Sequence, residues 1–171
     1  MEEDKERGKV EQMTDIGRSC AFTGHRPERL SIPEERVVSW LEDKIEEAVA
    51  NGYTDFISGM QRGVDIWAAE IVLRLRDSNP ELLLVAASAF EGMEDGWSKD
   101  WKERYERIID AADEVYYIGD RPGRRAFFER NEWMVDNASR LIAVYNGAPG
   151  GTQKTIEYAE RRGREVVAMG R

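Results

Sequence analysis

Three glycine-bearing loops hold most of the residues that could carry chemistry in this chain. They span residues 24–26, 58–65 and 147–152. Glycines allow close approach of a ligand to the backbone, while arginines and the free N–H groups of helix N-termini attract anions. These residue types favour binding of a phosphate group. The candidate ligand-binding residues in the loops are Gly24, His25, Arg26, Ser58, Gly59, Gly63, Asp65, Gly150, Gly151 and Thr152.

The loop from Ser58 to Asp65 also has a purely structural interpretation. It separates a short apolar run from a segment of helical apolar period, as in a buried strand that turns directly into a helix. Asp65 would then stabilise the first turn of that helix; the alternative is a hydrogen bond to a ribose. His25 is the sole histidine, so a Ser–His–Asp site would have to use it. Nothing marks Ser58 as an activated nucleophile, and a hydrogen-bonding role is favoured for it.

Two polar residues outside these loops are further candidates. Asn131 lies among apolar residues in the predicted helix 126–138, where a buried amide needs partners, either in another loop or in a ligand. Glu157 follows the third loop and is either a general acid–base group or a first-turn carboxylate that stabilises its helix. No constellation of His, Cys and carboxylates indicates a metal site.

The elements that must position these residues alternate between strand and helix from Arg18 onward. Strands are predicted over residues 19–23, 55–58, 82–87, 114–118, 141–145 and 165–169. The pattern predicts an α/β fold, with a mainly parallel sheet of about six strands and helices on both faces. Right-handed crossovers then bring all three loops to the carboxyl edge of the sheet, where such folds bind ligands. We expect the first strand at the centre, flanked by the second and fifth.

Length and composition limit the class of protein. The 171 residues suit one domain, predicted over 18–171, preceded by a flexible tail at 1–17 that has no apolar period. The single cysteine, Cys20, excludes an intrachain disulfide. No apolar run approaches the roughly 20 residues of a membrane span, and no signal-peptide pattern is present, so we expect a cytoplasmic protein. The net charge of −9 argues against a broad nucleic-acid-binding surface.

The loops do not follow the common nucleotide-binding motifs. The first strand is not followed by G-x-G-x-x-G, and the second ends in Ser58, where a dinucleotide site would place an acidic residue. No G-K-[ST] sequence is present. A nucleotide would therefore be held in an unorthodox way.

Four segments together resemble the YpsA-like branch of the SLOG superfamily. They are residues 23–27 (TGHRP), 58–70 (SGMQRGVDIWAAE), 130–136 (RNEWMVD) and 141–147 (LIAVYNG), followed by Gly150-Gly-Thr152. The resemblance covers essentially everything after Arg18. It implies a Rossmann-like fold and a nucleotide or nucleotide-derived ligand, such as NAD or ADP-ribose, and it is compatible with a homodimer.

Two groups of relatives imply different functions. Residues 58–65 are similar to the S-G-x-A-x-G-I-D stretch of DprA, which handles single-stranded DNA, with Gln61 in place of the alanine. Residues 149–157 are similar to the P-G-G-x-G-T-x-x-E signature of LOG-type phosphoribohydrolases, whose glutamate matches Glu157, although Gln153 and Lys154 replace the Gly-Thr pair. We therefore predict a nucleotide-ligand sensor or regulator, with an N-glycosidic hydrolase and a DprA-like DNA-associated module as alternatives.

Overall fold

The computed structural model describes residues 15–169, which form one six-stranded sheet in the order β4-β3-β2-β1-β5-β6. Every neighbouring pair of strands in this range is parallel. The strands are β1 (Ser19–Gly24), β2 (Asp55–Ser58), β3 (Leu83–Ser88), β4 (Glu114–Tyr117), β5 (Arg140–Val144) and β6 (Glu165–Met169). The predicted α/β fold is confirmed, and β1 lies between β2 and β5 as expected.

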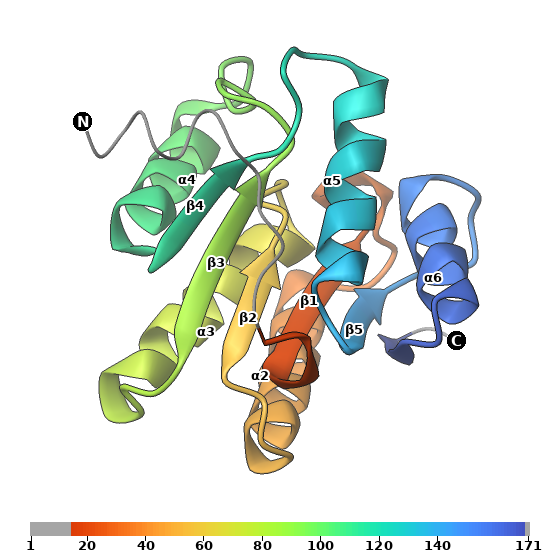
Figure 1. Ribbon diagram of the computed structural model, residues 1–171. Helices are drawn as coiled ribbons and strands as arrows, with labels where there is room; N and C mark the ends of the chain where they lie inside the picture. Colours follow the sequence, from red (N-terminus) through yellow and green to blue (C-terminus); the bar gives the residue numbers. More distant parts are fainter. Residues whose placement is uncertain (1–14, 170–171) are drawn as a thin grey trace.

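Within residues 15–169, five α-helices cover the two faces of the sheet. They are α2 (Glu34–Ala50), α3 (Val64–Ser78), α4 (Lys99–Ala111), α5 (Arg124–Asp136) and α6 (Gly151–Arg161), and short 3-10 helices span Ile16–Arg18 and Pro27–Arg29. Helices α2, α3 and α4 lie on one face, and α5 and α6 lie on the other (Figure 1). This division follows from strand order, because the chain steps from β1 to β4 in one direction and returns to β5 and β6 in the other. Right-handed crossovers in opposite directions place their helices on opposite faces.

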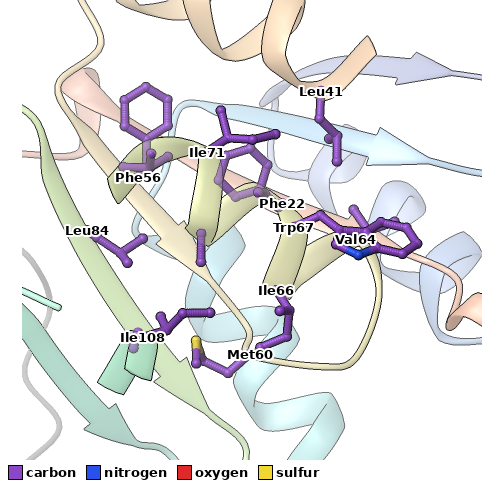
Figure 2. Close-up of a cluster of buried hydrophobic side chains, with 14 of the residues drawn as sticks. Phe22, Leu41, Phe56, Met60, Val64, Ile66, Trp67, Ile71, Leu84 and Ile108 are labelled. Carbon is purple, nitrogen blue, oxygen red and sulfur yellow. The ribbon is translucent and has the colours of Figure 1, made fainter. Parts of the chain in front are cut away.

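Each central strand is buried on both faces, which explains its unbroken apolar sequence. In β1, Cys20 and Phe22 face the α2–α4 side, and Ala21 faces the α5–α6 side. The ring of Phe22 stacks on Phe56 of β2 with centroids 6.1 Å apart. The sheet has a hydrophobic core on each face, and the larger one lies on the α2–α4 side. Figure 2 shows this larger core, in which side chains of α3 such as Trp67 pack over the sheet.

The reversal of strand order occurs between β1 and β5. The chain leaves β1 toward β2, and it leaves β5 toward β6 on the opposite side. Loops that diverge in this way leave a crevice at the carboxyl ends of their strands. The fold therefore provides a place for a ligand between the first and third glycine loops.

Part of the predicted N-terminal tail, residues 1–14, lies outside the described residues. Its last residues, 15–17, are described, and the carbonyl of Asp15 accepts a hydrogen bond of 2.7 Å from the Ser19 hydroxyl at the start of β1. Between residues 15 and 169, no helix is both long and apolar enough to span a membrane.

Candidate functional site

A cavity of about 320 Å³ opens at the carboxyl edge of the sheet, where the three loops meet. Its walls come from the loop after β1, the loop before α3, the inner face of α5 and the start of α6. The predicted ligand-binding residues that line it are Gly24, His25, Arg26, Asp65, Asn131, Gly151 and Thr152. The tertiary structure thus brings together candidates from all three loops and from α5.

Other predicted residues support the walls without lining the cavity. The hydroxyl of Ser58 is buried; it donates to the Asp65 carbonyl at 2.8 Å and accepts from the Met60 N–H at 3.2 Å. Ser58 therefore shapes the turn between β2 and α3 instead of facing a ligand. Gly63 is the residue before α3, with φ of 92°, and Gly150 is the corresponding residue before α6.

Gly59 lies between a buried carboxylate and a buried guanidinium. A Cβ atom at this position would come within 2.8 Å of both Asp65 Oδ2 and Arg130 Nη1. Since real Cβ atoms do not approach other atoms so closely, a side chain here would force the Asp65 carboxylate or the Arg130 guanidinium to move, and glycine avoids that shift. The glycine thus allows α5 to place an arginine directly against the loop that follows β2.

Arg130 starts the 130–136 segment that carries the family resemblance, but it is not among the predicted ligand-binding residues. It is 4% exposed and lines the cavity. Its guanidinium donates to the carbonyl of Gly59, to the carbonyl of Ala87 at 3.5 Å and to the side-chain oxygen of Asn131 at 2.8 Å. One signal was available, because Arg130 follows Phe127 by three residues and precedes Met134 by four, which places it on the helix face that packs on the sheet.

Asp65 uses its two carboxylate oxygens differently. Oδ2 accepts a hydrogen bond of 3.2 Å from the Gln61 N–H, which closes the loop before α3. Oδ1 is buried and has no hydrogen-bond partner among the described residues. Burial raises the pKa of Asp65 to about 6, against the opposing effects of Arg130 and of the Gln61 N–H. The structural and the ligand-binding interpretations of Asp65 are therefore compatible, one for each oxygen.

His25 is also buried at the cavity surface. Its side chain is 3% exposed, its ring stacks on Tyr145 with centroids 5.8 Å apart, and Nε2 has no hydrogen-bond partner in the described part of the chain. Burial and the nearby positive charge of Arg29 lower the pKa of His25, with a smaller opposing effect from Asn146. The imidazole is thus held in its neutral form at neutral pH.

Three exposed arginines surround the opening of the cavity, and we call Arg26, Arg29 and Arg124 the arginine rim. Arg29 donates to the Pro149 carbonyl at 3.2 Å, which links the loop after β1 to the loop after β5. Arginines suit phosphate because their planar guanidinium can donate two parallel hydrogen bonds. The rim therefore gives the cavity mouth a concentrated positive charge in a chain that is acidic overall.

Three helices begin at the cavity, and two of them, α5 and α6, differ in charge from α3 and from the remaining helices. Helices α2, α3 and α4 carry acidic residues in their first turns, whereas α5 and α6 carry none. The first turn of α5 holds Arg124 and Arg125, whose positive charges interact unfavourably with the helix dipole. Helix N-termini without acidic residues, next to an arginine rim, favour an external anion at this position.

Aromatic side chains from α5 form another wall. Phe127 and Phe128 line the cavity. Phe128 is 39% exposed, and no other large apolar residue among the described residues is as exposed. An exposed ring next to the arginine rim provides a surface on which a flat aromatic group can stack.

Glu157 lies outside this cavity. It lines a second cavity of about 200 Å³ between α5 and α6, together with Lys154 and Tyr158. The two cavities share Phe128 and Asn131 in their walls. Glu157 is therefore adjacent to the arginine-rimmed cavity, beyond the aromatic wall. Within residues 15–169, no cluster of three or more His, Cys, Asp or Glu side chains could hold a metal ion.

Comparison with known proteins gives matches over most of the chain. The sequence model of the YpsA family, described as the YspA SLOG family, matches residues 20–166. UPF0398 proteins are similar: the one from Bacillus thuringiensis strain Al Hakam is 32% identical over 152 residues, covering 84% of this chain and 83% of that protein. The one from Bacillus cereus strain AH820 is 31% identical over the same length, with the same coverage.

Solved structures support the fold. DNA processing protein A (DprA) from Streptococcus pneumoniae superposes with a TM-score of 0.61 at 20% identity, over 90% of this chain. DprA from Helicobacter pylori, whose structure is described in terms of single-stranded DNA binding, gives a TM-score of 0.62 at 18% identity, also over 90% of this chain. This chain spans about half (51%) of the first protein and 66% of the second.

Proposed function

Because the chain belongs to the YpsA family of SLOG proteins, we propose that it binds a nucleotide or nucleotide-derived phosphate compound in the arginine-rimmed cavity. The observation that carries this proposal is the meeting of the arginine rim with the acid-free N-termini of α5 and α6. Each feature alone attracts anions, and both converge where strand order reverses. A phosphate placed there meets guanidinium groups and free backbone N–H groups together.

The size and the aromatic wall favour a ligand larger than phosphate. At about 320 Å³ the cavity falls within the range of roughly 300–1,000 Å³ that is typical of small-molecule sites. Phe128 supplies a stacking surface, and Asn131 supplies an amide next to it. A base on the aromatic wall and a phosphate at the rim match the two ends of a nucleotide.

A regulatory role fits these residues better than turnover. The carboxylate matched to the LOG-type signature, Glu157, borders the neighbouring cavity instead of the one with the rim. The buried Arg130 and Ser58 are engaged in hydrogen bonds with loop backbone. We therefore place the protein among ligand-binding sensors or regulators, with the bound nucleotide as the signal.

Titration calorimetry with AMP, ADP-ribose, NAD, inorganic phosphate and a short single-stranded DNA tests the proposal. AMP or a larger nucleotide should bind, and Arg124→Ala should weaken it about tenfold or more through loss of a charge-assisted hydrogen bond. Arg125→Ala is the matched control, since Arg125 lies in the same turn but pairs with Glu129 outside the cavity.

Two results would refute this function. Absence of binding by every phosphate-bearing small molecule would remove the ligand, and equal weakening by Arg124→Ala and Arg125→Ala would indicate a non-specific charge effect. Binding of single-stranded DNA alone, with steep salt dependence, would instead favour the DNA-associated alternative.

Hydrolysis of a nucleotide N-glycosidic bond is a second candidate, favoured by the shared walls of the two cavities. A base that stacks on Phe128 would extend toward Glu157, which could then act as general acid or base at the sugar–base bond. Incubation of AMP with the protein should release free adenine, and Glu157→Gln should abolish that release while AMP still binds. Absence of free adenine at high protein concentration would leave the binding function alone.

A further inference from the structure

Two residues that line the arginine-rimmed cavity each carry a buried polar atom without a hydrogen-bond partner. His25 is 3% exposed and Asp65 is 5% exposed, both line the cavity, and both His25 Nε2 and Asp65 Oδ1 lack partners among the described residues. We call these two residues the floor pair. Because buried polar groups in folded proteins are nearly always hydrogen-bonded, two such atoms on residues that line one cavity point to a ligand that supplies their partners.

The neighbours of Asp65 leave Oδ1 available for this purpose. Oδ2 is occupied by the Gln61 N–H. Arg130 directs its hydrogen bonds to Gly59, Ala87 and Asn131, and no hydrogen bond between described residues joins it to Asp65. Oδ1 therefore needs a hydrogen-bond donor from outside the chain.

The chemistry of the floor pair excludes a phosphate as its partner. A carboxylate oxygen repels a phosphate, and a neutral imidazole offers it no charge. A hydroxyl group suits both residues, because it can donate to Asp65 and can either donate to or accept from His25. The stacking of His25 on Tyr145 holds the ring in place for such a contact.

The charges divide the cavity into two zones. The arginine rim is exposed, whereas the floor pair is buried beneath it. A ligand that satisfies both zones has a phosphate at one end and hydroxyl groups that reach inward. A phosphorylated ribose has this arrangement, with a vicinal diol separated from the 5′-phosphate by the sugar ring.

We propose that His25 and Asp65 bind the vicinal hydroxyl groups of a phosphorylated ribose, so that the cavity selects ribonucleotides over deoxyribonucleotides. This inference rests on the proposed function and narrows its ligand class. A site built to hydrogen-bond a hydroxyl rejects an analogue that lacks it, since its own polar groups are then left unpaired.

Calorimetric titrations of the unmodified protein with paired ligands test the selection directly. AMP should bind at least about tenfold more tightly than 2′-deoxy-AMP or 3′-deoxy-AMP. Ribose 5-phosphate should likewise bind more tightly than 2-deoxyribose 5-phosphate, which shows that the sugar, and not the base, carries the preference. These comparisons need no variant and so do not depend on whether a variant folds.

Variants of the floor pair then assign the preference to residues. Asp65→Asn retains an oxygen that can accept from the Gln61 N–H but removes the second acceptor, and His25→Phe retains a ring against Tyr145 but removes Nε2. Each should reduce the ratio of AMP to deoxy-AMP affinity toward one. Asp77→Asn, at the exposed far end of α3, is the control and should leave the ratio unchanged.

The outcomes separate this inference from the proposed function. Equal binding of AMP and both deoxy analogues would overturn the assignment of His25 and Asp65 to the ribose hydroxyl groups and leave nucleotide binding intact. Retention of the full preference in both floor variants, with their melting temperatures showing folded protein, would also overturn it. Absence of binding by AMP, ADP-ribose, NAD and ribose 5-phosphate alike would overturn the function and this inference together.

Discussion

At the scale of single residues, Asp65 shows how one side chain serves the fold and the site together. Its Oδ2 closes the loop before α3, and its Oδ1 is buried without a partner among the described residues, in a side chain that lines the cavity. The carboxyl group is buried, and Arg130 offsets only part of the cost of its charge. Such a group has a measurable effect on stability that depends on pH.

The first prediction concerns this pH dependence. Burial raises the pKa of Asp65 from 3.8 to about 6, so the folded protein binds a proton there more tightly than the unfolded chain does. The contribution of Asp65 to the free energy of unfolding is therefore largest below about pH 4, and it falls by about 3 kcal/mol in total as the pH rises through about 6 to neutral. Urea unfolding across this range should show a fall in the wild type that Asp65→Asn lacks.

The control for this experiment is Asp77→Asn, which replaces an exposed carboxylate on the same helix. Its unfolding free energy should follow the wild-type curve across the pH range. Parallel curves for the wild type and Asp65→Asn would show that the buried carboxyl titrates as it does in the unfolded chain.

At the scale of elements, the N-termini of α5 and α6 favour anion binding at the expense of helix stability. Neither helix has an acidic residue in its first turn. An acidic residue there would stabilise the helix dipole but repel a phosphate. Stability and affinity should therefore change in opposite directions when this position is mutated.

Gln153, in the first turn of α6, allows the second prediction because it does not line the cavity. Gln153→Glu should raise the free energy of unfolding by about 0.3–1 kcal/mol and weaken AMP binding several-fold. Gln153→Lys, the opposite change, should lower stability and strengthen AMP binding. Urea unfolding and calorimetry measure the two effects, and changes of the same sign in both quantities would contradict the role of the helix N-terminus.

At the scale of the whole molecule, the core and the site occupy different parts of the sheet. The larger core lies between the sheet and helices α2, α3 and α4, whereas the cavity lies at the carboxyl edge against α5 and α6. Changes in the core that leave the fold intact should therefore affect stability much more than ligand affinity.

The third prediction is that Phe56→Ala lowers stability strongly and leaves ligand affinity nearly unchanged. The substitution removes one ring of the stacked Phe22–Phe56 pair in a fully buried environment, and it should cost about 3–5 kcal/mol of unfolding free energy. At a temperature where the variant is folded, its affinity for AMP should stay within about threefold of the wild type. Phe56→Leu should cost less, and a large loss of affinity in either variant would show that the core and the site are coupled.

Much of the fold was predictable because its signals are local. The apolar strands at 55–58 and 165–169 and the glycine turns that end other strands mark the elements directly. The prediction that β2 and β5 flank β1 is also confirmed, since crossover handedness limits the alternatives. The bounds of β1 and β4 differ from the predicted ones by one position at one end, and β3 and β5 are shifted by one position at both ends, where local signals are weakest.

The sequence by itself determined that three glycine loops meet at one edge of a parallel sheet, because chain direction and crossover handedness leave no other place for them. Only the tertiary structure decided which side chains face the cavity. It turned Ser58 inward to its own loop, set Glu157 in a neighbouring cavity, and brought Arg130 against Gly59, 71 positions earlier in the chain. Such pairings depend on the packing of distant segments, for which neither residue type nor spacing carries a local signal.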